Sequence, residues 1–160
     1  MTREAFISHV ERTEKAFRRF LTALCCGDAA LADDIAQEAY IKAYLACGDM
    51  TRSEKIGAWL YKIGYTTFLN HKRSERITVG YEEAGQPVSC ETADAAFRYQ
   101  LLYMALDRLP PKERSAILLF YFENYSAKEI AEIVGASPDA VRQYLTRGRN
   151  HLRKMLIGAR

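Results

Sequence analysis

The sequence contains no apolar run longer than seven residues, the run from Ala116 to Phe122. A helix that crosses a bilayer needs about 20 apolar residues, so this pattern excludes a transmembrane segment. The first residues, Met1 to Ala5, are not followed by the long apolar stretch of a secretory signal. The hydrophobic content of 49% and the charged content of 27% are typical of a globular protein. We therefore expect a soluble cytoplasmic protein.

Clustered metal ligands and catalytic motifs are also lacking. The cysteines and histidines of the chain are Cys25, Cys26, Cys47, Cys90, His9, His71 and His151. They include no C-x-x-C pair and no zinc-finger spacing. We interpret the cysteines as small apolar residues in a reducing compartment, with a redox sensor or a metal site as the alternative. No nucleophile motif or phosphate-binding loop occurs, so we expect no catalytic residue, no metal and no cofactor, and a helical enzyme is disfavoured.

Basic residues are concentrated at one end of the chain. The formal net charge is +3, yet residues 139–160 alone hold six basic residues and one acidic residue. Residues 75–97 show the opposite balance, with five acidic residues and one basic residue. A basic end on a mildly charged protein indicates a polyanionic partner.

Apolar residues recur at a spacing of three to four along most of the chain, which predicts helices and no persistent strand. The predicted core-facing residues of the first three helices are Phe6, Val10, Phe17, Phe20, Leu21 and Leu24; Ala32, Ile35, Ala36, Ala39, Tyr40, Ala43, Tyr44 and Cys47; and Ile56, Leu60, Ile63 and Thr67. The pattern resumes with Phe97, Leu101, Leu102, Ala105, Leu106 and Leu109.

The periodicity fails between Glu75 and Ala93, where Gly80, Gly85 and Pro87 occur. We therefore predict an all-α protein with two small helical domains, residues 1–74 and 97–160. An acidic flexible linker, residues 75–96, would join them.

Helix boundaries can be assigned from single residues. Asp28 and Ser53 are predicted to cap the second and third helices, because their side chains can accept from free backbone N–H groups. Gly48 is predicted to end the second helix. After the break at Pro110, Pro111 is predicted to lie in the first turn of a helix that runs through Tyr121.

Two short helical patterns meet at the stretch EIVGASPDAV, residues 132–141. Ser126 and Glu129 form the pattern of a capping box at the start of the first helix. Gly135 can take the left-handed conformation that ends it. Ser137 and Pro138 then have the pattern of a cap and a first helical residue for the next helix.

The spacing around this turn predicts a helix-turn-helix. Small Ala131 lies four residues before Gly135, and apolar Val141 lies six after it. Two steeply crossing helices need a small residue at their closest point and apolar residues on the facing sides. In such a motif the second helix enters the major groove of DNA. An ordinary helical hairpin is the alternative on spacing alone.

The second helix of this motif has a basic face. Its predicted buried stripe is Val141, Leu145, Gly148, Leu152 and Leu156. The residues that we predict to bind duplex DNA are Arg142, Gln143, Tyr144, Thr146, Arg147, Arg149, Asn150, Arg153 and Lys154. Arginine and glutamine can form two-pronged hydrogen bonds with base edges, whereas Arg153 and Lys154 are expected at phosphates. A solvated charged face usually mixes signs, but no acid follows Asp139 here.

Three stretches of the sequence carry a family resemblance: LADDIAQEAYIKAY, IGAWLYKIGYTTFLNHKRS and LPPKERSAILLFYFENYSAKEIAEIVGASPDAVRQYLTRGRNHLRKML, in residues 31–44, 56–74 and 109–156. The resemblance is to an extracytoplasmic-function (ECF, group IV) RNA polymerase sigma factor of the sigma-70 family. It implies a promoter-specificity subunit that binds core RNA polymerase and directs transcription initiation. The N-terminal domain would melt and read the downstream promoter element, and the C-terminal domain would read the upstream element as duplex. It also implies an anti-sigma partner, and we expect a monomer when the chain is free.

By this resemblance, Asp34, Gln37 and Glu38 would meet the polymerase. Asp34, Glu38, Ile41 and Leu45 also form a stripe away from the core stripe of the same helix. An apolar face with little reason to be exposed suggests a partner. The alternative is that Ile41 and Leu45 are sandwiched between two other helices.

The third helix and the loop before it match the melting and downstream-reading region. The residues that we predict to bind there are Asp49, Met50, Thr51, Arg52, Tyr61, Lys62, Tyr65, Asn70, Lys72 and Arg73. Aromatic and basic groups alternate in the helix, which suits stacking on unpaired bases and contact with their backbone. Trp59 is interpreted as a core residue. Gly57 and Gly64 are expected to allow a neighbouring helix to approach closely.

Three features of the sequence allow more than one interpretation. The acidic linker would mimic nucleic acid in a polymerase channel, or serve only as a soluble tether. Tyr144 and Thr66 depart from the resemblance, since relatives usually carry a basic residue and an asparagine there; Tyr144 cannot make an arginine's fork on guanine. A conventional helix-turn-helix regulator is the alternative function, although no apolar seam is left for the dimer that such proteins usually form.

Overall fold

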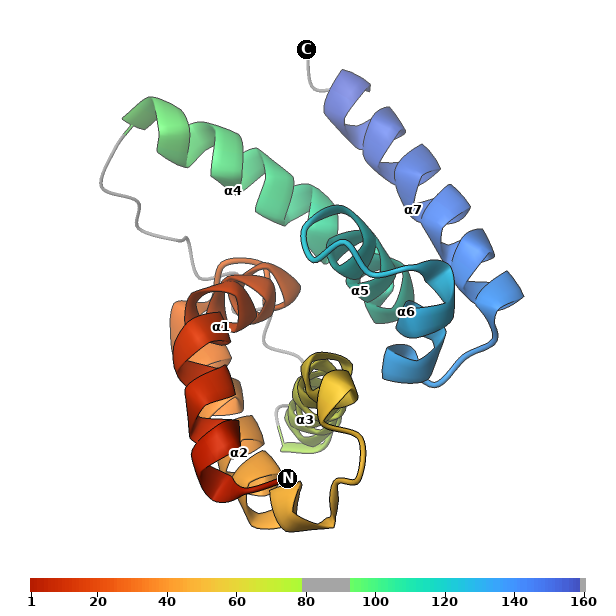
Figure 1. Cartoon of the computed structure of the whole chain (residues 1–160). Helices are drawn as coiled ribbons and strands as arrows, with labels where there is room; N and C mark the ends of the chain where they lie inside the picture. The colour runs from red at the N-terminus through yellow and green to blue at the C-terminus, as the bar shows by residue number, and fades with distance from the viewer. Residues whose placement is uncertain (79–92, 159–160) are drawn as a thin grey trace.

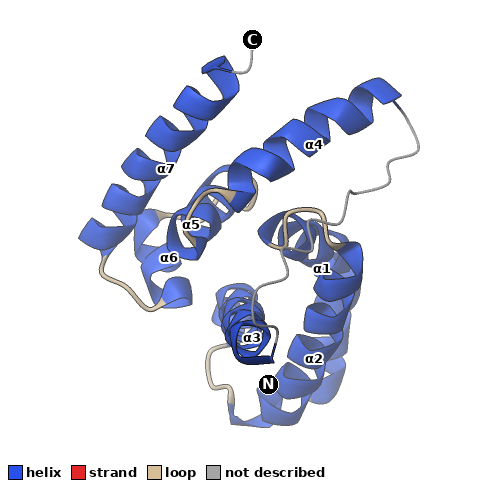
Figure 2. Ribbon diagram, turned by 180° about the vertical axis from the view of Figure 1, so that it is seen from behind, coloured by secondary structure: helices blue, strands red, loops and turns tan. Residues whose placement is uncertain are grey.

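The computed structural model describes residues 1–78 and 93–158, and every regular element within them is helical. The N-terminal domain consists of α1 (Arg3–Leu24), α2 (Ala29–Ala46) and α3 (Ile56–Thr78). The C-terminal domain consists of α4 (Ala93–Asp107), α5 (Pro111–Tyr121), α6 (Ala127–Val134) and α7 (Pro138–Gly158). Figures 1 and 2 show the two groups of helices from opposite sides. The predicted all-α architecture with two helical domains is confirmed. Among the described residues, no helix combines the length and apolar character needed to cross a bilayer.

The N-terminal core forms where α1 packs against α2 and α2 packs against α3. Phe17, Leu21, Ile35 and Ala39 are fully buried in it, and Leu60 nearly so. These residues come from the three predicted stripes, so the helical periodicity identified the inner faces correctly. Trp59, Tyr40 and Tyr44 are only partly buried and pack against the edge of this core.

The ends of α1 and α2 depart in part from the prediction. Asp28 caps α2 as predicted, with its Oδ1 accepting from the Leu31 N–H at 3.1 Å. Gly48 lies just past the end of α2, as predicted, but it is not left-handed: α2 stops at Ala46 and continues as a short 3₁₀ turn, Cys47–Asp49. The left-handed residues lie instead after α1, at Cys26 (φ 56°) and Gly27 (φ 91°).

In the C-terminal domain, α5 is the central helix and contacts both α6 and α7. Pro111 is its first residue and Tyr121 its last, as predicted. Ala116, Leu118 and Leu119 are buried on it.

The helices on either side of the predicted linker are longer than expected. α3 continues to Thr78 and α4 begins at Ala93, so both enter the stretch 75–96. The acidic residues Glu82, Glu83 and Glu91, on which the prediction of nucleic-acid mimicry depends, lie outside the described residues.

The two domains contact each other through α3 with α6 and α1 with α5. Their buried side chains form one continuous cluster, from Phe6 in α1 to Leu145 in α7. We call this contact between the domains the interdomain seam.

Candidate nucleic-acid and polymerase interfaces

The turn between α6 and α7 has the predicted local chemistry. Ser126 Oγ accepts from the Glu129 N–H at 3.2 Å, and Glu129 Oε1 accepts from the Ser126 N–H at 3.1 Å, which completes the capping box. Gly135 ends α6 in the left-handed region, at φ 71° and ψ 44°. Ser137 Oγ accepts from the Ala140 N–H at 3.1 Å and caps α7. Local sequence therefore determines where each helix of the pair begins and ends.

The helix pair is held on its inner side by the residues that spacing predicted. Ala131 and Ile130 of α6 and Val141 and Leu145 of α7 are all buried. A Cβ at Gly148 would lie 2.9 Å from Cγ1 of Ile117, so the glycine lets α7 approach α5 closely. Leu156 was wrongly predicted to be buried: it is 41% exposed near the C-terminal end of α7.

The outer side of α7 is open to solvent. The exposed residues of the predicted DNA-binding set are Arg142, Gln143, Thr146, Arg147, Arg149, Asn150, Arg153 and Lys154. Arg142 Nη1 lies 2.6 Å from Asp139 Oδ1 one turn earlier, and Arg149 Nη1 donates to the Tyr121 hydroxyl at 3.2 Å. The other three basic residues of this set have no acidic partner among the described residues, so the face carries a strong positive charge.

Tyr144 differs from the rest of this set, because it is only partly exposed. It lies at a groove of about 480 Å³ on the seam, which Tyr65, Lys72, Lys112 and Arg147 also line. Tyr144 therefore faces α3 more than it faces the outer side of α7.

The residues predicted to bind the downstream element fall into two groups. The exposed or partly exposed ones are Asp49, Met50, Thr51, Arg52, Lys62, Asn70, Lys72 and Arg73. Tyr61 and Tyr65 are not available in this conformation, because they are 6% and 2% exposed. Sequence periodicity could not predict all of this burial, since the side chains that cover these rings come from the C-terminal domain as well as from α1.

Tyr61 lies in an aromatic cluster that both domains build. Its ring packs edge-on against Phe17, Phe20 and Tyr125, with centroids 5.3, 4.9 and 5.5 Å away. Its hydroxyl donates to Glu123 Oε2 at 2.8 Å. Burial raises the pKa of Tyr61, and the hydrogen bond to the Glu123 carboxylate raises it further. The hydroxyl thus stays protonated and holds the carboxylate.

The outer face of α2 carries the residues predicted to meet the polymerase. Ile41 and Leu45 are 61% and 70% exposed, so they are not sandwiched between helices. With Ile7 and Val10 of α1 they line an apolar groove of about 330 Å³. Asp34 at the other end of this face is also exposed. The face therefore combines an acidic end with an uncovered apolar end.

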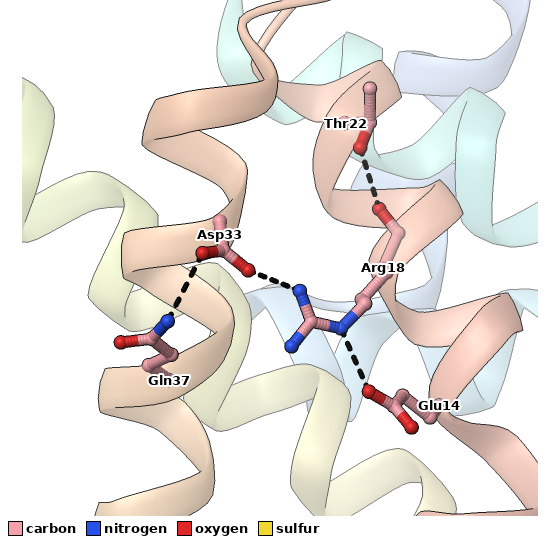
Figure 3. A network of polar contacts seen from close by, with 5 residues as sticks. All are labelled: Glu14, Arg18, Thr22, Asp33 and Gln37. Carbon is pink, nitrogen blue, oxygen red and sulfur yellow. Dashed lines mark hydrogen bonds and ion pairs between the residues drawn. The ribbon is translucent and has the colours of Figure 1, made fainter.

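Polar contacts hold two other side chains of this face in place. Gln37 Nε2 donates to Asp33 Oδ2 at 3.0 Å, and Arg18 of α1 bridges Asp33 to Glu14 (Figure 3). Glu38 lies 2.7 Å from Nε2 of His71 in α3 and 3.1 Å from Nζ of Lys42.

These two neighbours, His71 first and then Lys42, lower the pKa of Glu38, so it remains a carboxylate at neutral pH.

The cysteines of the described residues do not form a reactive site. Burial raises the pKa of Cys25 to about 12 and that of Cys26 to about 11, so both thiols are uncharged at neutral pH. Within the described parts of the chain, no group of three or more histidine, cysteine, aspartate and glutamate side chains could hold a metal ion. Cys90 lies outside the described residues.

Comparison with known proteins identifies the family of the chain. Residues 9–77 match the family described as Sigma-70 region 2, and residues 99–152 match Sigma-70, region 4. The ECF RNA polymerase sigma factor SigW of Bacillus subtilis is 29% identical over 145 residues, which cover 81% of this chain and 78% of SigW. The RNA polymerase sigma factor SigV of the same bacterium is 32% identical over 124 residues, which cover 77% of this chain and 74% of SigV.

The fold is also found among solved structures. The sigma factor RpoE from Bartonella quintana, solved in complex with the anti-sigma factor NepR, is similar with a TM-score of 0.79 at 23% identity, over 97% of this chain and 98% of that one. The chain belongs to the sigma-70 family and, within it, to the extracytoplasmic-function (ECF) RNA polymerase sigma factors.

Proposed function

We propose that this chain, as a sigma subunit that directs transcription initiation, divides its work among three surfaces. The outer side of α7 reads the upstream promoter element as duplex. The loop at residues 48–52 and the outer side of α3 hold the melted downstream element. The outer face of α2 binds core RNA polymerase. The observation that carries this assignment is the exposed basic side of α7 on a capped helix-turn-helix.

The chemistry of α7 supports sequence readout near its N-terminus. Arg142, Gln143 and Arg147 lie in the first turns of the helix, which enter the major groove in this motif. Their side chains can hydrogen-bond in pairs with the edges of guanine and adenine. Arg153 and Lys154 lie farther along and would contact phosphates, which position the helix without reading sequence.

The chemistry of α3 supports contact with a single strand. Lys62 and Arg73 are exposed cations that can follow a phosphate backbone, and exposed Asn70 can hydrogen-bond with bases. Asp49 and Arg52 in the preceding loop are exposed as well, so an unpaired base can reach them. Tyr61 and Tyr65 would add stacking platforms only after the domains separate.

The α2 face supports a protein partner rather than DNA. Asp34 and Glu38 would repel phosphates, whereas exposed Ile41 and Leu45 gain by being covered. In this arrangement the polymerase supplies the catalytic chemistry, so the chain itself needs no catalytic residue, metal or cofactor and acts in the cytoplasm as a monomer when free. Two similar proteins of known structure were solved with the anti-sigma factor NepR and with the cytosolic domain of CnrY, and we extend an anti-sigma partner to this chain.

Run-off transcription with a cognate core polymerase tests this function. Addition of the chain should direct initiation from a defined set of genomic promoters. A chain that binds DNA alone as a dimer and directs no initiation would instead be a conventional helix-turn-helix regulator.

A further inference from the structure

The proposed function gives Tyr144 no role, although this residue lies in the helix that reads the upstream duplex. Its side chain is only partly exposed, and it lines the groove of about 480 Å³ where α3, α5 and α7 meet. Pockets of this volume are large enough to enclose much of a small molecule. The residues that line the groove therefore determine which small molecule fits it.

Four cations from both domains line this groove. Lys72 and Arg73 come from α3, Lys112 from α5 and Arg147 from α7. The last three are exposed and have no acidic partner among the described residues. Lys72 lies 3.4 Å from Glu75, but an ion pair between two largely exposed side chains contributes little. Cations gathered in one cleft raise the local concentration of anions, so the groove attracts a negatively charged ligand.

One acidic residue, Glu113, also lines the groove. It is 7% exposed, and its Oε1 lies 3.0 Å from Nδ1 of His151 in α7. This carboxylate is nearly buried and engaged by a histidine, so the exposed charge of the groove is positive. Ammonium and guanidinium groups donate strong hydrogen bonds to phosphate oxygens, and a guanidinium can donate two at once. A phosphate group therefore suits the cations better than a weaker acceptor.

The rest of the groove is apolar. Leu69 and Tyr144 are partly exposed, Pro110 is exposed, and Tyr65 adds a ring that is 2% exposed. A nucleobase of any kind gains free energy by stacking on an aromatic side chain. An inorganic phosphate would leave this apolar surface in contact with water. A ligand that joins phosphates to an aromatic ring meets both parts of the groove.

We propose that the groove binds a nucleoside polyphosphate, with its phosphates among Lys72, Arg73, Lys112 and Arg147 and its base on Tyr144. Arg147 also belongs to the residues that read the upstream duplex, so the nucleotide and the duplex compete for one side chain. This competition rests on the proposed function of α7, whereas binding of the nucleotide to the free chain does not.

The first test removes a cation that has no part in the proposed DNA surfaces. The probe is mant-ADP, an ADP with a fluorescent group on its ribose, titrated at fixed ionic strength without divalent cations. Lys112→Ala should weaken its binding about tenfold, because a hydrogen bond between charged groups is lost. Lys128→Ala removes an equal charge from an exposed position of α6 outside the groove, and this matched control should leave the affinity unchanged. Equal affinity in Lys112→Ala and the parent, or no saturable binding by the parent, would overturn the proposal.

The second test separates the base from the phosphates. Tyr144→Ala should weaken binding of mant-ADP about tenfold, whereas Tyr144→Phe keeps the ring and should bind as the parent does. Inorganic pyrophosphate should displace mant-ADP at least about tenfold less effectively than unlabelled ADP. Pyrophosphate as effective as ADP would mean that only phosphates are bound, which would overturn the assignment to a nucleotide. Circular dichroism checks that Tyr144→Ala is folded; if it is not, the pyrophosphate comparison decides.

The third test separates failure of this inference from failure of the proposed function. ADP at ten times its Kd should raise the apparent Kd of an upstream-element duplex about tenfold, by mass action. An unchanged Kd for the duplex would overturn the placement of the phosphates at Arg147. A chain that directs run-off transcription but binds no nucleotide contradicts only the nucleotide site. A chain that binds mant-ADP in the groove but directs no transcription with any cognate core polymerase contradicts the proposed function instead.

Discussion

Nη1 of Arg114 donates a hydrogen bond to the carbonyl oxygen of Leu24 across the interdomain seam, at 2.8 Å. The same guanidinium donates from Nε to Leu106 and from Nη2 to Leu109, at 2.8 and 3.0 Å. These acceptors are backbone carbonyls near the ends of α1 and α4, where helices lack their own donors. One buried cation thus satisfies the ends of two helices from different domains.

Replacing this cation should destabilise the whole chain. Arg114→Met keeps much of the volume but removes the guanidinium donors to the buried carbonyls of Leu24 and Leu109, so we expect a loss of about 2 to 4 kcal/mol in the free energy of unfolding. Urea denaturation followed by circular dichroism measures it. Arg108→Ala, at an exposed position between α4 and α5, is the control and should stay within about 0.5 kcal/mol of the parent. A loss of stability no larger than that of the control would show that Arg114 is dispensable.

Gly64 should resist substitution by any larger residue. A Cβ there would lie 2.9 Å from Cζ of Phe17, which is fully buried and has no room to move. We predict that overpacking by Gly64→Ala costs about 1 to 3 kcal/mol, which outweighs or cancels the gain of about 1 kcal/mol in helix propensity. Gly48→Ala is the matched control, because nothing lies within 4 Å of its added Cβ. Thermal unfolding of the two variants compares them, and equal midpoints would contradict the close approach of α1 to α3.

The caps and turns at helix ends could be predicted from the sequence, whereas the contacts between the two domains could not. The turn from Ser126 to Ser137 was predictable because caps and a left-handed glycine act within a few residues. The expectation that Gly57 and Gly64 allow close approach is confirmed, although Gly57 meets the Tyr125 loop rather than a helix.

The contacts across the seam could not be predicted in the same way. Tyr61 and Glu123 are 62 residues apart in sequence, and neither periodicity nor composition pairs them. An aromatic residue beside basic residues on a helix is the sequence pattern of a site for single-stranded DNA. The pattern is the same whether or not another domain covers the aromatic ring. For the same reason, the role of Arg114 in capping α1 had no local signal.

The apolar end of α2 should be needed for the polymerase but not for the fold. Leu45 is 70% exposed, so Leu45→Asp should leave the free energy of unfolding within about 0.5 kcal/mol of the parent. A charge placed in a covered apolar contact should weaken binding to core polymerase by about 2 kcal/mol or more, roughly thirtyfold. Lys15→Asp, on an exposed position of α1 outside the apolar groove, serves as the control. Pull-down of core polymerase at increasing sigma concentration gives the affinities, and undiminished binding by Leu45→Asp would assign the polymerase contact to another surface.

Thiol chemistry should be slow in the folded chain. The pKa of about 12 for Cys25 and about 11 for Cys26 means that few thiolates are present at pH 8, so alkylation should be at least about a hundredfold slower than for a free thiol. Mass spectrometry after timed exposure to iodoacetamide measures each site. Because the folded pKa values are raised, their contribution to stability is full below pH 9 and is lost as the pH rises toward 11 and 12. Rapid labelling of either cysteine at pH 8 would contradict this burial.

Individual residues on the basic side of α7 should make separate, measurable contributions to binding of the upstream element. Arg147→Ala should weaken binding to an upstream-element duplex by about 1 to 3 kcal/mol and relax specificity at one base pair. Arg142→Ala should lose less, because Arg142 must first leave Asp139, 2.6 Å away. Lys154→Ala is the comparison for phosphate contact and should weaken specific and random duplexes alike. Fluorescence anisotropy at two salt concentrations separates base contacts from phosphate contacts. If Arg147→Ala weakened binding to all duplexes equally, Arg147 would not contact a base.

Run-off transcription with core RNA polymerase, comparing the parent chain with the Arg142→Ala/Arg147→Ala double variant, tests the central claim most directly. We predict that the parent directs initiation from its promoters and that the double variant loses at least about tenfold of this activity, in keeping with the loss of two paired base contacts, while it still binds core polymerase. Initiation at parental levels by the double variant, or none by the parent, would contradict the account of α7 as the upstream reader of a sigma subunit.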